Sequence, residues 1–249
     1  MNKNIFSKLF YLYPTFLFGD PGVFDRWIWL RKNITLGFIK TLDAGCGSGA
    51  FSLYAAYVGN SVVGISFNAK KNLIATQRAD KIFLKNIQFI NYDLRKLEDL
   101  KDMFGSVDQI ICFEMIEHIL DDKKLIQNFY SLLKTGGKLL LTTPYKYYVR
   151  LPGDKISQSE DGGHVRWGYT HEELSDLLTQ CRFTIEKKEF VTGFISQLLI
   201  RVMRYIASYN YFIAWAIIFF LRPLTLFDPF ITRLIGFPYL SIAVVALKK

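Results

Sequence analysis

Cysteine and histidine are scarce in this sequence of 249 residues, which contains three of each. The cysteines, Cys46, Cys112 and Cys181, form no CxxC pair and stand among apolar residues or glycines. Three isolated cysteines cannot build a disulfide framework, and their spacing does not match that of a structural zinc site. We therefore interpret them as reduced thiols, which favours a cytoplasmic location.

An unbroken apolar run long enough to cross a membrane is also missing. The candidate is the uncharged run at residues 205–221, where polar Ser208 and Asn210 lie near the start. A helix that crosses a bilayer needs roughly 20 predominantly apolar residues, so an interfacial or re-entrant helix fits this run better. A helix buried against the rest of the protein is the alternative. Lys8 and Pro14 interrupt the apolar N-terminus, and no small-residue cleavage site follows, so we do not expect a cleaved signal peptide.

The middle of the chain lacks net charge. The whole sequence has a formal charge of +9, yet residues 41–192 hold equal numbers of basic and acidic side chains. The excess lies in the two flanks, 1–40 and 193–249, which also hold 22 of the 40 aromatic residues. Basic, aromatic and apolar flanks around a neutral middle are typical of a protein at an anionic membrane surface. No stretch mixes positive charge with Gly, Ser and Asn, so we expect no nucleic-acid partner.

Regular alternation marks the central part of the sequence. Hydrophobic residues make up 51% of the chain, which excludes disorder. From residue 38 to 192, short apolar runs such as FIKTLDAG and SVVGISF alternate with longer amphipathic ones. This pattern predicts an α/β fold with a doubly wound, mostly parallel sheet. We divide the chain into an N-terminal helical cap, a core, an apolar and basic helical insert, and a final strand: residues 1–37, 38–192, 193–236 and 237–249.

A glycine-rich run, TLDAGCGSGAF at residues 41–51, carries the strongest chemical signal. An apolar strand ends at Asp43, and Gly45, Gly47 and Gly49 follow before a helix. Glycines there let the backbone turn tightly and approach a ligand at the first crossover of an open sheet. The run also satisfies GxGxxA, so a dinucleotide-dependent oxidoreductase is an alternative. A carboxylate at Asp43 would repel a pyrophosphate and suit a ligand with a cationic amino-acid end.

Three more segments extend a resemblance to a known family: VDQIICFEMIEHILDD, LLKTGGKLLLTTPY and GGHVRWGYTHEELSDLLTQCRF. With the glycine-rich run, they resemble the class I S-adenosylmethionine-dependent methyltransferases over residues 24–192 and the last strand. The quinone-biosynthesis O-methyltransferases are among the nearer-looking relatives. The resemblance implies a Rossmann-like sheet of seven strands with an antiparallel last strand and S-adenosylmethionine as the cofactor. The apolar helical insert would precede that last strand.

The same resemblance implies which residues contact the cofactor. Ser66 stands where the family usually has an acidic residue that binds the ribose, and a hydroxyl accepts hydrogen bonds more weakly. This departure keeps open a second alternative, a membrane-attached binding protein without catalytic activity. The remaining implied contacts, from the methionyl end to the adenine and the closing strand, are Asp43, Gly45, Gly47, Gly49, Phe67, Asp93, Leu94, Phe113, Glu114 and Arg26.

Two of the three histidines are candidate catalytic residues. Transfer to an oxygen of high pKa needs a general base, and neutral histidine suits that role near pH 7. His118 follows the fourth predicted strand and His164 lies in a glycine-flanked loop, so both are expected at the active site. Packing roles are the alternative for each. Arg166 and Tyr169, in the same loop as His164, are predicted substrate contacts.

A metal site made of Glu114, Glu117 and His118 is conceivable, because some quinone O-methyltransferases are metal-assisted. The spacing does not put all three residues on one helix face, since Glu114 belongs to the predicted strand. We therefore predict no metal.

The insert completes the functional prediction. It is rich in Phe, Ile, Leu and Trp and carries four spaced arginines: Arg201, Arg204, Arg222 and Arg233. We expect its helices to lie beside the mouth of the active site or on the edge of the sheet, in the membrane interface, with a homodimer surface as the alternative. The predicted protein is a methyltransferase, peripheral on the inner face of the membrane, that modifies an oxygen of a lipid-linked or membrane-proximal small-molecule acceptor. A quinone precursor, a polyprenyl-linked sugar and a glycolipid all fit.

Overall fold

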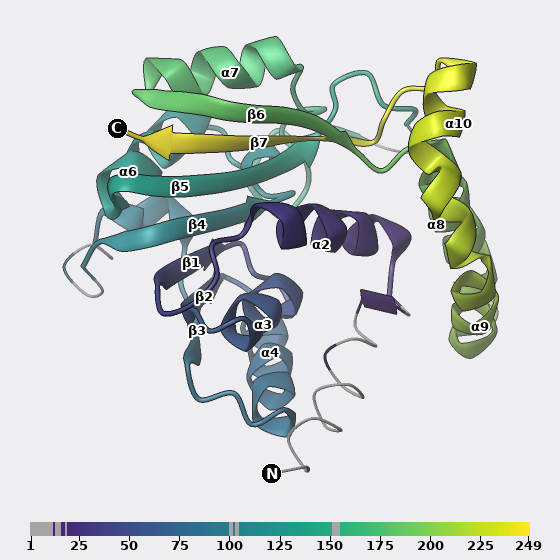
Figure 1. The fold of residues 1–249 in the computed structure, drawn as a ribbon, viewed down its shortest axis with the longest axis horizontal. Coiled ribbons are helices and arrows are strands. Elements are labelled where there is room, and N and C mark those ends of the chain that lie inside the picture. The colour runs from purple at the N-terminus through teal and green to yellow at the C-terminus, as the bar shows by residue number, and fades with distance from the viewer. Residues whose placement is uncertain (1–11, 13–15, 18, 100–101, 103–104, 151–154) are drawn as a thin grey trace.

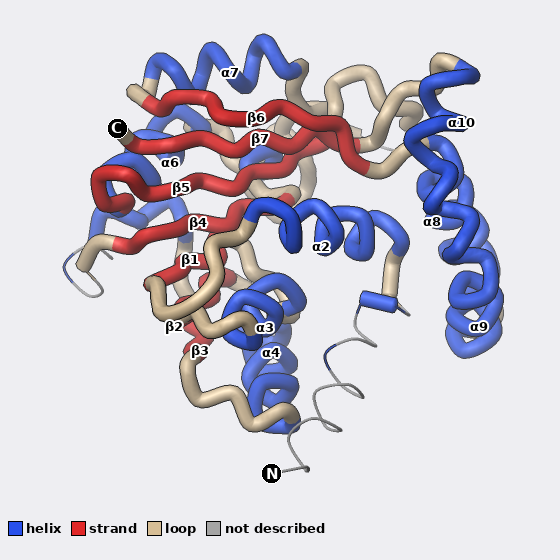
Figure 2. Tube along the Cα trace, in the orientation of Figure 1, coloured by secondary structure: helices blue, strands red, loops and turns tan. Residues whose placement is uncertain are grey.

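A seven-stranded sheet forms the centre of the protein (Figures 1 and 2). The computed structural model describes residues 12, 16–17, 19–99, 102, 105–150 and 155–249. Most of the first half of the predicted N-terminal cap therefore lies outside the described residues. The strands are β1 (Lys40–Ala44), β2 (Ser61–Ser66), β3 (Ile87–Asn91), β4 (Val107–Phe113), β5 (Leu133–Pro144), β6 (Phe183–Val191) and β7 (Ser241–Lys248).

The order of the strands confirms the predicted fold class. They are arranged β3-β2-β1-β4-β5-β7-β6, and the pairs among β1 to β5 are parallel. β7 is antiparallel to both of its neighbours, β5 and β6. The order reverses at β1, so the crevice for a ligand lies above the carboxyl ends of β1 and β4.

Helices cover both faces of the sheet, because its central strands are apolar on both sides. One face packs against α6 (Asp122–Leu132) and α7 (His171–Gln180). The other packs against α2 (Pro21–Asn33), α3 (Ala50–Tyr57) and α4 (Ala69–Lys81). β7 shows how the faces divide: Val244 belongs to the first core cluster, and its neighbours Ala243 and Val245 belong to the second.

The insert forms α8 (Phe194–Ala207), α9 (Tyr211–Leu221), the 3₁₀ helix η3 (Arg222–Phe227) and α10 (Asp228–Ile235). Figure 1 shows these helices beyond the carboxyl ends of the parallel strands. Pro223 and Pro229 stand in the first turns of η3 and α10, where proline is tolerated. The helical segment Tyr211–Ile235 is long and apolar enough to cross a membrane by length and composition, and 22% of its most apolar stretch is buried.

A buried carboxylate on α10, that of Asp228, joins two helices of the insert. Asp228 accepts hydrogen bonds from the backbone N–H groups of Gly193, Ile195 and Ser196, at 2.8–3.1 Å. It also accepts the Thr232 hydroxyl at 2.9 Å. One side chain on α10 thereby caps the start of α8, because the first N–H groups of a helix have no partner within the helix.

Candidate active site

The glycine-rich run forms the turn between β1 and α3. Gly45, Gly47 and Gly49 have φ angles of 86°, 54° and 82°, in the left-handed region that favours glycine. A Cβ atom on Gly45 would lie 2.5 Å from Cγ of Met115, and one on Gly49 would lie 2.8 Å from Cβ of Ala75. At Gly47 a Cβ atom would meet nothing within 4 Å. Packing therefore requires two of the glycines, and the third leaves backbone open to a ligand.

Asp43 lies beneath this turn and not at its surface. The side chain is 1% exposed, and Oδ2 accepts the Ser52 hydroxyl at 2.5 Å. Burial raises the pKa of Asp43 to about 7. Among the residues that the structure describes, the hydrogen-bond partner of this carboxylate is Ser52 alone. The role of Asp43 as a direct cofactor contact stays a prediction.

The implied ribose and adenine contacts lie at the ends of β2 and β3. Ser66 is buried, and its hydroxyl accepts the Asn68 N–H at 3.2 Å. Phe67 next to it is 70% exposed, which leaves a ring face free for stacking. Asp93 already has a partner, because Arg95 binds both carboxylate oxygens and lowers the pKa of Asp93. Leu94 is buried.

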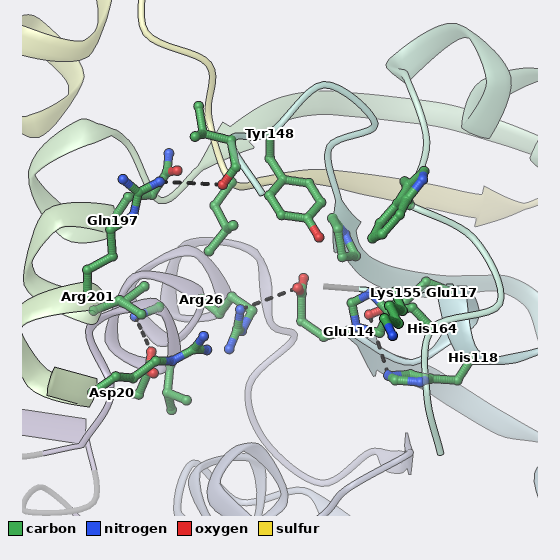
Figure 3. A pocket seen from close by; sticks show the side chains of 18 residues that line it. Asp20, Arg26, Glu114, Glu117, His118, Tyr148, Lys155, His164, Gln197 and Arg201 are labelled. Atoms are coloured by element: carbon green, nitrogen blue, oxygen red, sulfur yellow. Dashed lines mark hydrogen bonds and ion pairs between the residues drawn. The ribbon is translucent and has the colours of Figure 1, made fainter. Parts of the chain in front are cut away.

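At the end of β4, Glu114 adopts a left-handed φ of 49°. Its carboxylate accepts the hydroxyls of Thr142 and Ser241, at 3.0 and 3.2 Å. Arg26, predicted to pair with the cofactor carboxylate, places Nη1 3.6 Å from Oε2 of Glu114 (Figure 3). Phe113, the preceding residue, packs edge-on against Phe51. The structure thus joins two predicted cofactor contacts in one ion pair.

The two candidate catalytic histidines meet. Their ring centroids are 4.7 Å apart, although 45 residues separate them in sequence. Nδ1 of His118 lies 2.9 Å from the carbonyl oxygen of Gly163. A carbonyl can only accept, so Nδ1 carries the proton and Nε2 of the neutral ring is left with a lone pair. That nitrogen is on the side of Glu117, 3.9 Å from Oε1.

Glu117 is a member of this cluster that the sequence analysis considered only as a metal ligand. It is fully buried, and burial together with neighbouring Glu114 raises its pKa well above the usual range. Oε2 accepts the Thr143 hydroxyl at 3.2 Å, and Oε1 has no hydrogen-bond partner. The spacing EMIEH could have suggested the pair Glu117 and His118, but not the contact with the distant loop.

Glu117, His118 and His164 could also hold a metal ion. Each offers one ligand atom, and these atoms lie within 4.8 Å of one another. A buried carboxylate oxygen without a partner fits a cation, and carboxylate with imidazole is a common ligand set. The prediction of no metal considered Glu114 in place of His164, so it rested on a set of residues that the structure does not bring together as ligands.

The two predicted substrate contacts, Arg166 and Tyr169, hold the loop that contains His164 in place. The Arg166 guanidinium binds Asp122 and the carbonyl oxygens of Ile119 and Leu120. Tyr169 donates its hydroxyl to Asp122 at 2.6 Å and is buried. These contacts hold the loop on α6, so a substrate-binding role for either residue stays a prediction. His171 packs on Phe190 at the start of α7.

A cavity of about 490 Å³ adjoins the histidines (Figure 3). Its walls come from α2, the ends of β4 and β5, the loop that contains His164, and α8 of the insert. The sequence analysis expected the insert beside the active site but did not identify the residues that line the cavity, because nothing in the spacing of residues on α8 shows which face turns toward the core. The insert residues that line the cavity are Gln197, Ile200, Arg201 and Arg204.

Comparison with known proteins settles the family. Residues 24–188 match the family described as "Methyltransferase domain". The chain belongs to the class I S-adenosylmethionine-dependent methyltransferases. This match confirms the predicted family and argues against the alternative of a dinucleotide-dependent oxidoreductase.

The chain is 33% identical over 115 residues to a ubiquinone biosynthesis O-methyltransferase of Coxiella burnetii. A protein of the same name from Xanthomonas euvesicatoria is 33% identical over 116 residues. The match spans about half the length of each relative and 46% of this methyltransferase.

Solved structures show the same fold at lower identity. A methyltransferase from Mesorhizobium loti aligns with a TM-score of 0.58 and 19% identity, covering 90% of this chain and 97% of the other. Magnesium protoporphyrin IX methyltransferase from Synechocystis, with S-adenosylmethionine bound, aligns with a TM-score of 0.54 and 17% identity, covering 100% of this chain and 85% of the other. The [4+2]-cyclase SpnF aligns with a TM-score of 0.62 and 19% identity, covering 90% of this chain and 81% of the other. Because a cyclase shares the fold, the fold alone does not fix the reaction of this methyltransferase.

Proposed function

We propose that this methyltransferase transfers a methyl group from S-adenosylmethionine to an oxygen of a lipid-linked acceptor at the cytoplasmic face of the membrane. The cavity carries this proposal. One of its walls holds His118 and His164 together with Arg26 and Glu114, two of the predicted cofactor contacts, and the opposite wall is α8, which continues into the exposed apolar helices of the insert. An acceptor in the cavity would therefore reach both a general base and an apolar surface.

The residues at the carboxyl edge of the sheet support the reaction. The bound donor supplies a methyl group already activated on a sulfonium, so the protein mainly has to align the acceptor. Nε2 of His118 can take the proton of an acceptor hydroxyl as the oxygen forms its bond to the methyl carbon and the carbon–sulfur bond breaks. The hydrogen bond from Nδ1 to Gly163 keeps the ring in the tautomer that this step needs.

The surface of the insert supports the membrane part of the proposal. Many apolar side chains along α9, η3 and α10 are exposed to solvent, and such a cluster, unlike a single exposed residue, indicates an interaction surface. Arg233 is exposed on the same helices, and a basic residue contributes roughly 1 kcal/mol near an anionic leaflet. The most exposed of these apolar residues are Phe212, Phe220 and Leu226, each at least 78% exposed.

Arg222 does not contribute to this surface, which corrects one expectation. It is 6% exposed, its Nη2 donates to the carbonyl oxygen of Gly19 at 2.7 Å, and its guanidinium lies over the Phe24 ring. The residue anchors the insert to the start of α2 and is unavailable to lipid.

Flotation with vesicles, combined with labelled methyl transfer into a lipid extract, tests the proposal. We expect the protein to float with vesicles that contain phosphatidylglycerol and to label a lipid. Replacing Phe212, Phe220 and Leu226 together by serine should abolish flotation while leaving the binding of S-adenosylhomocysteine intact. Phe38→Ser is the matched control, because Phe38 is fully exposed just before β1, away from the insert.

Two results would contradict the proposal. A wild-type protein that stays off the vesicles and forms a tight soluble dimer would assign the apolar surface to a second copy of the chain. A protein that binds the cofactor but labels nothing in any extract would favour the binding protein without catalytic activity.

A further inference from the structure

Two arginines of α8 line the cavity on the wall opposite the two histidines (Figure 3). Arg201 and Arg204 are three positions apart, so their side chains lie on one helix face as neighbours. Figure 3 shows Arg201 beside Gln197, across the cavity from Glu117, His118 and His164. Arg201 donates to the Val149 carbonyl oxygen at 3.5 Å, which is a long contact for a guanidinium.

These arginines lack ionic partners among the residues that the structure describes. At the other end of the cavity, Glu114 pairs with Arg26, and Glu117 is buried with a pKa raised well above its usual range, so neither carboxyl group is available to these arginines. Asp20 lies on the arginine side, but its Oδ1 accepts the Gly22 N–H at 2.7 Å and caps α2. Two guanidinium groups thus share a cavity wall with one carboxylate that already serves a helix terminus.

We propose that Arg201 and Arg204 bind a phosphate group of the acceptor, so that the substrate is a lipid phosphate or diphosphate and not a neutral lipid. This inference rests on the proposed methyltransferase function. Guanidinium groups form paired, charge-assisted hydrogen bonds with phosphate oxygens, and such bonds are about twice as strong as neutral ones.

The position of the arginines also fits a phosphate group that links a polar head group to a hydrocarbon chain in one acceptor molecule. α8 lines the cavity and also packs on α9 and α10, whose apolar side chains are exposed. A head group would occupy the histidine end, the phosphate would meet the arginines, and the hydrocarbon chain would lie over the insert. A phosphate without a chain, such as that of a soluble phosphorylated sugar, would satisfy the arginines but not the apolar surface.

Binding measurements on the full chain loaded with S-adenosylhomocysteine test this. The probes are farnesyl phosphate, farnesol and inorganic phosphate, titrated by calorimetry. We expect farnesyl phosphate to bind at least about tenfold more tightly than farnesol or inorganic phosphate. The double substitution Arg201→Gln and Arg204→Gln should reduce the affinity for farnesyl phosphate by about tenfold to a hundredfold and leave that for farnesol unchanged.

Arg182→Gln is the matched control, since Arg182 is an exposed arginine just before β6, outside the insert, and does not line the cavity. It should bind farnesyl phosphate as the wild type does, and Arg201→Lys with Arg204→Lys should recover part of the lost affinity.

Three outcomes would overturn the proposal. Equal affinities for farnesol and farnesyl phosphate would mean that the arginines do not bind the phosphate group. Inorganic phosphate that binds as tightly as farnesyl phosphate would point to a soluble phosphorylated acceptor. Weakened binding of S-adenosylhomocysteine in the double variant would mean that the arginines hold the cofactor carboxylate. In the first and third cases, methyl transfer and flotation by the wild type would still be observed if the proposed function is correct.

Discussion

The rings of His118 and His164 lie edge to face, with centroids 4.7 Å apart and planes inclined by 83°. Gly163 fixes this pair by placing its carbonyl oxygen on Nδ1 of His118, immediately before His164 in the chain. The loop that carries His164 is thereby tied to the segment that follows β4. The two candidate catalytic histidines are held in one arrangement by this contact.

Replacing His118 by alanine should lower kcat by about a hundredfold to ten-thousandfold, because the acceptor hydroxyl would lose its general base. The affinity for S-adenosylhomocysteine should stay within about twofold, since His118 lies on the acceptor side of the site. Single-turnover transfer and calorimetry would measure the two quantities.

Raising the pH provides a check on that assignment. Transfer by His118→Ala should recover as the acceptor hydroxyl ionises by itself, whereas the wild type should not need high pH. If prolonged dialysis against a chelator abolishes wild-type activity, and zinc or magnesium restores it, then His118 acts with Glu117 and His164 as a metal ligand and the general-base assignment is wrong.

Gly47→Ala should weaken cofactor binding while leaving the stability of the fold nearly unchanged. A Cβ atom at this position meets nothing within 4 Å, so unfolding should become easier by only about 1 kcal/mol from the positive φ. We expect the affinity for S-adenosylmethionine to fall by tenfold or more, as the added methyl group would occupy the backbone surface where the cofactor approaches.

Gly136→Ala is the control for that variant. Gly136 also has a positive φ, at 78°, and open space around its Cβ position, but it belongs to the amino-terminal part of β5, away from the site. It should show the same loss of stability by urea unfolding and normal cofactor binding. If both variants bind the cofactor normally, the turn does not contact it.

Asp25 predicts a dependence of stability on pH. Burial raises its pKa from 3.8 to about 6, although the hydroxyls of Ser196 and Thr192 partly lower it. The folded state therefore retains a proton that the unfolded state loses, and stability declines as pH rises from about 4 to 6 and then levels off. Asp25→Asn should remove about 2 kcal/mol of the decline in unfolding free energy between about pH 4.5 and 7.5.

Urea unfolding of both proteins across that range would measure the difference. Some decline should remain in Asp25→Asn, because Asp43 has a pKa raised to about 7 and acts in the same direction. Parallel curves for the wild type and the variant would show that Asp25 is ionised in the folded protein throughout.

Asp228→Ala should loosen the insert. The change removes the acceptor of three backbone N–H groups at the start of α8, and leaving such groups unpaired costs about 2–4 kcal/mol in total. Limited proteolysis should cut within residues 194–235 much faster than in the wild type. Asp176→Ala, at an exposed position of α7, should change stability by less than about 0.5 kcal/mol. Equal proteolysis of the two variants would mean that other contacts hold the insert.

Local patterns were sufficient to predict the sheet and the turn of this methyltransferase. The alternation of apolar runs and the three glycines depend on short-range geometry, and both are found where the sequence placed them. Partners brought together by the fold could not be predicted in this way. Arg26 meets Glu114 across 88 positions, and Arg222 is buried against the start of α2, because packing between distant segments decides both contacts.

The placement of β7 affects how the protein can form during synthesis. β7 hydrogen-bonds to β5 on one side and β6 on the other, yet residues 194–235 of the insert are translated before it. Until Ser241–Lys248 pairs with them, the facing edges of β5 and β6 have no strand between them, although α8, α9 and α10 have already been translated. The apolar helices can therefore meet a lipid surface or a chaperone before the domain that carries them is closed.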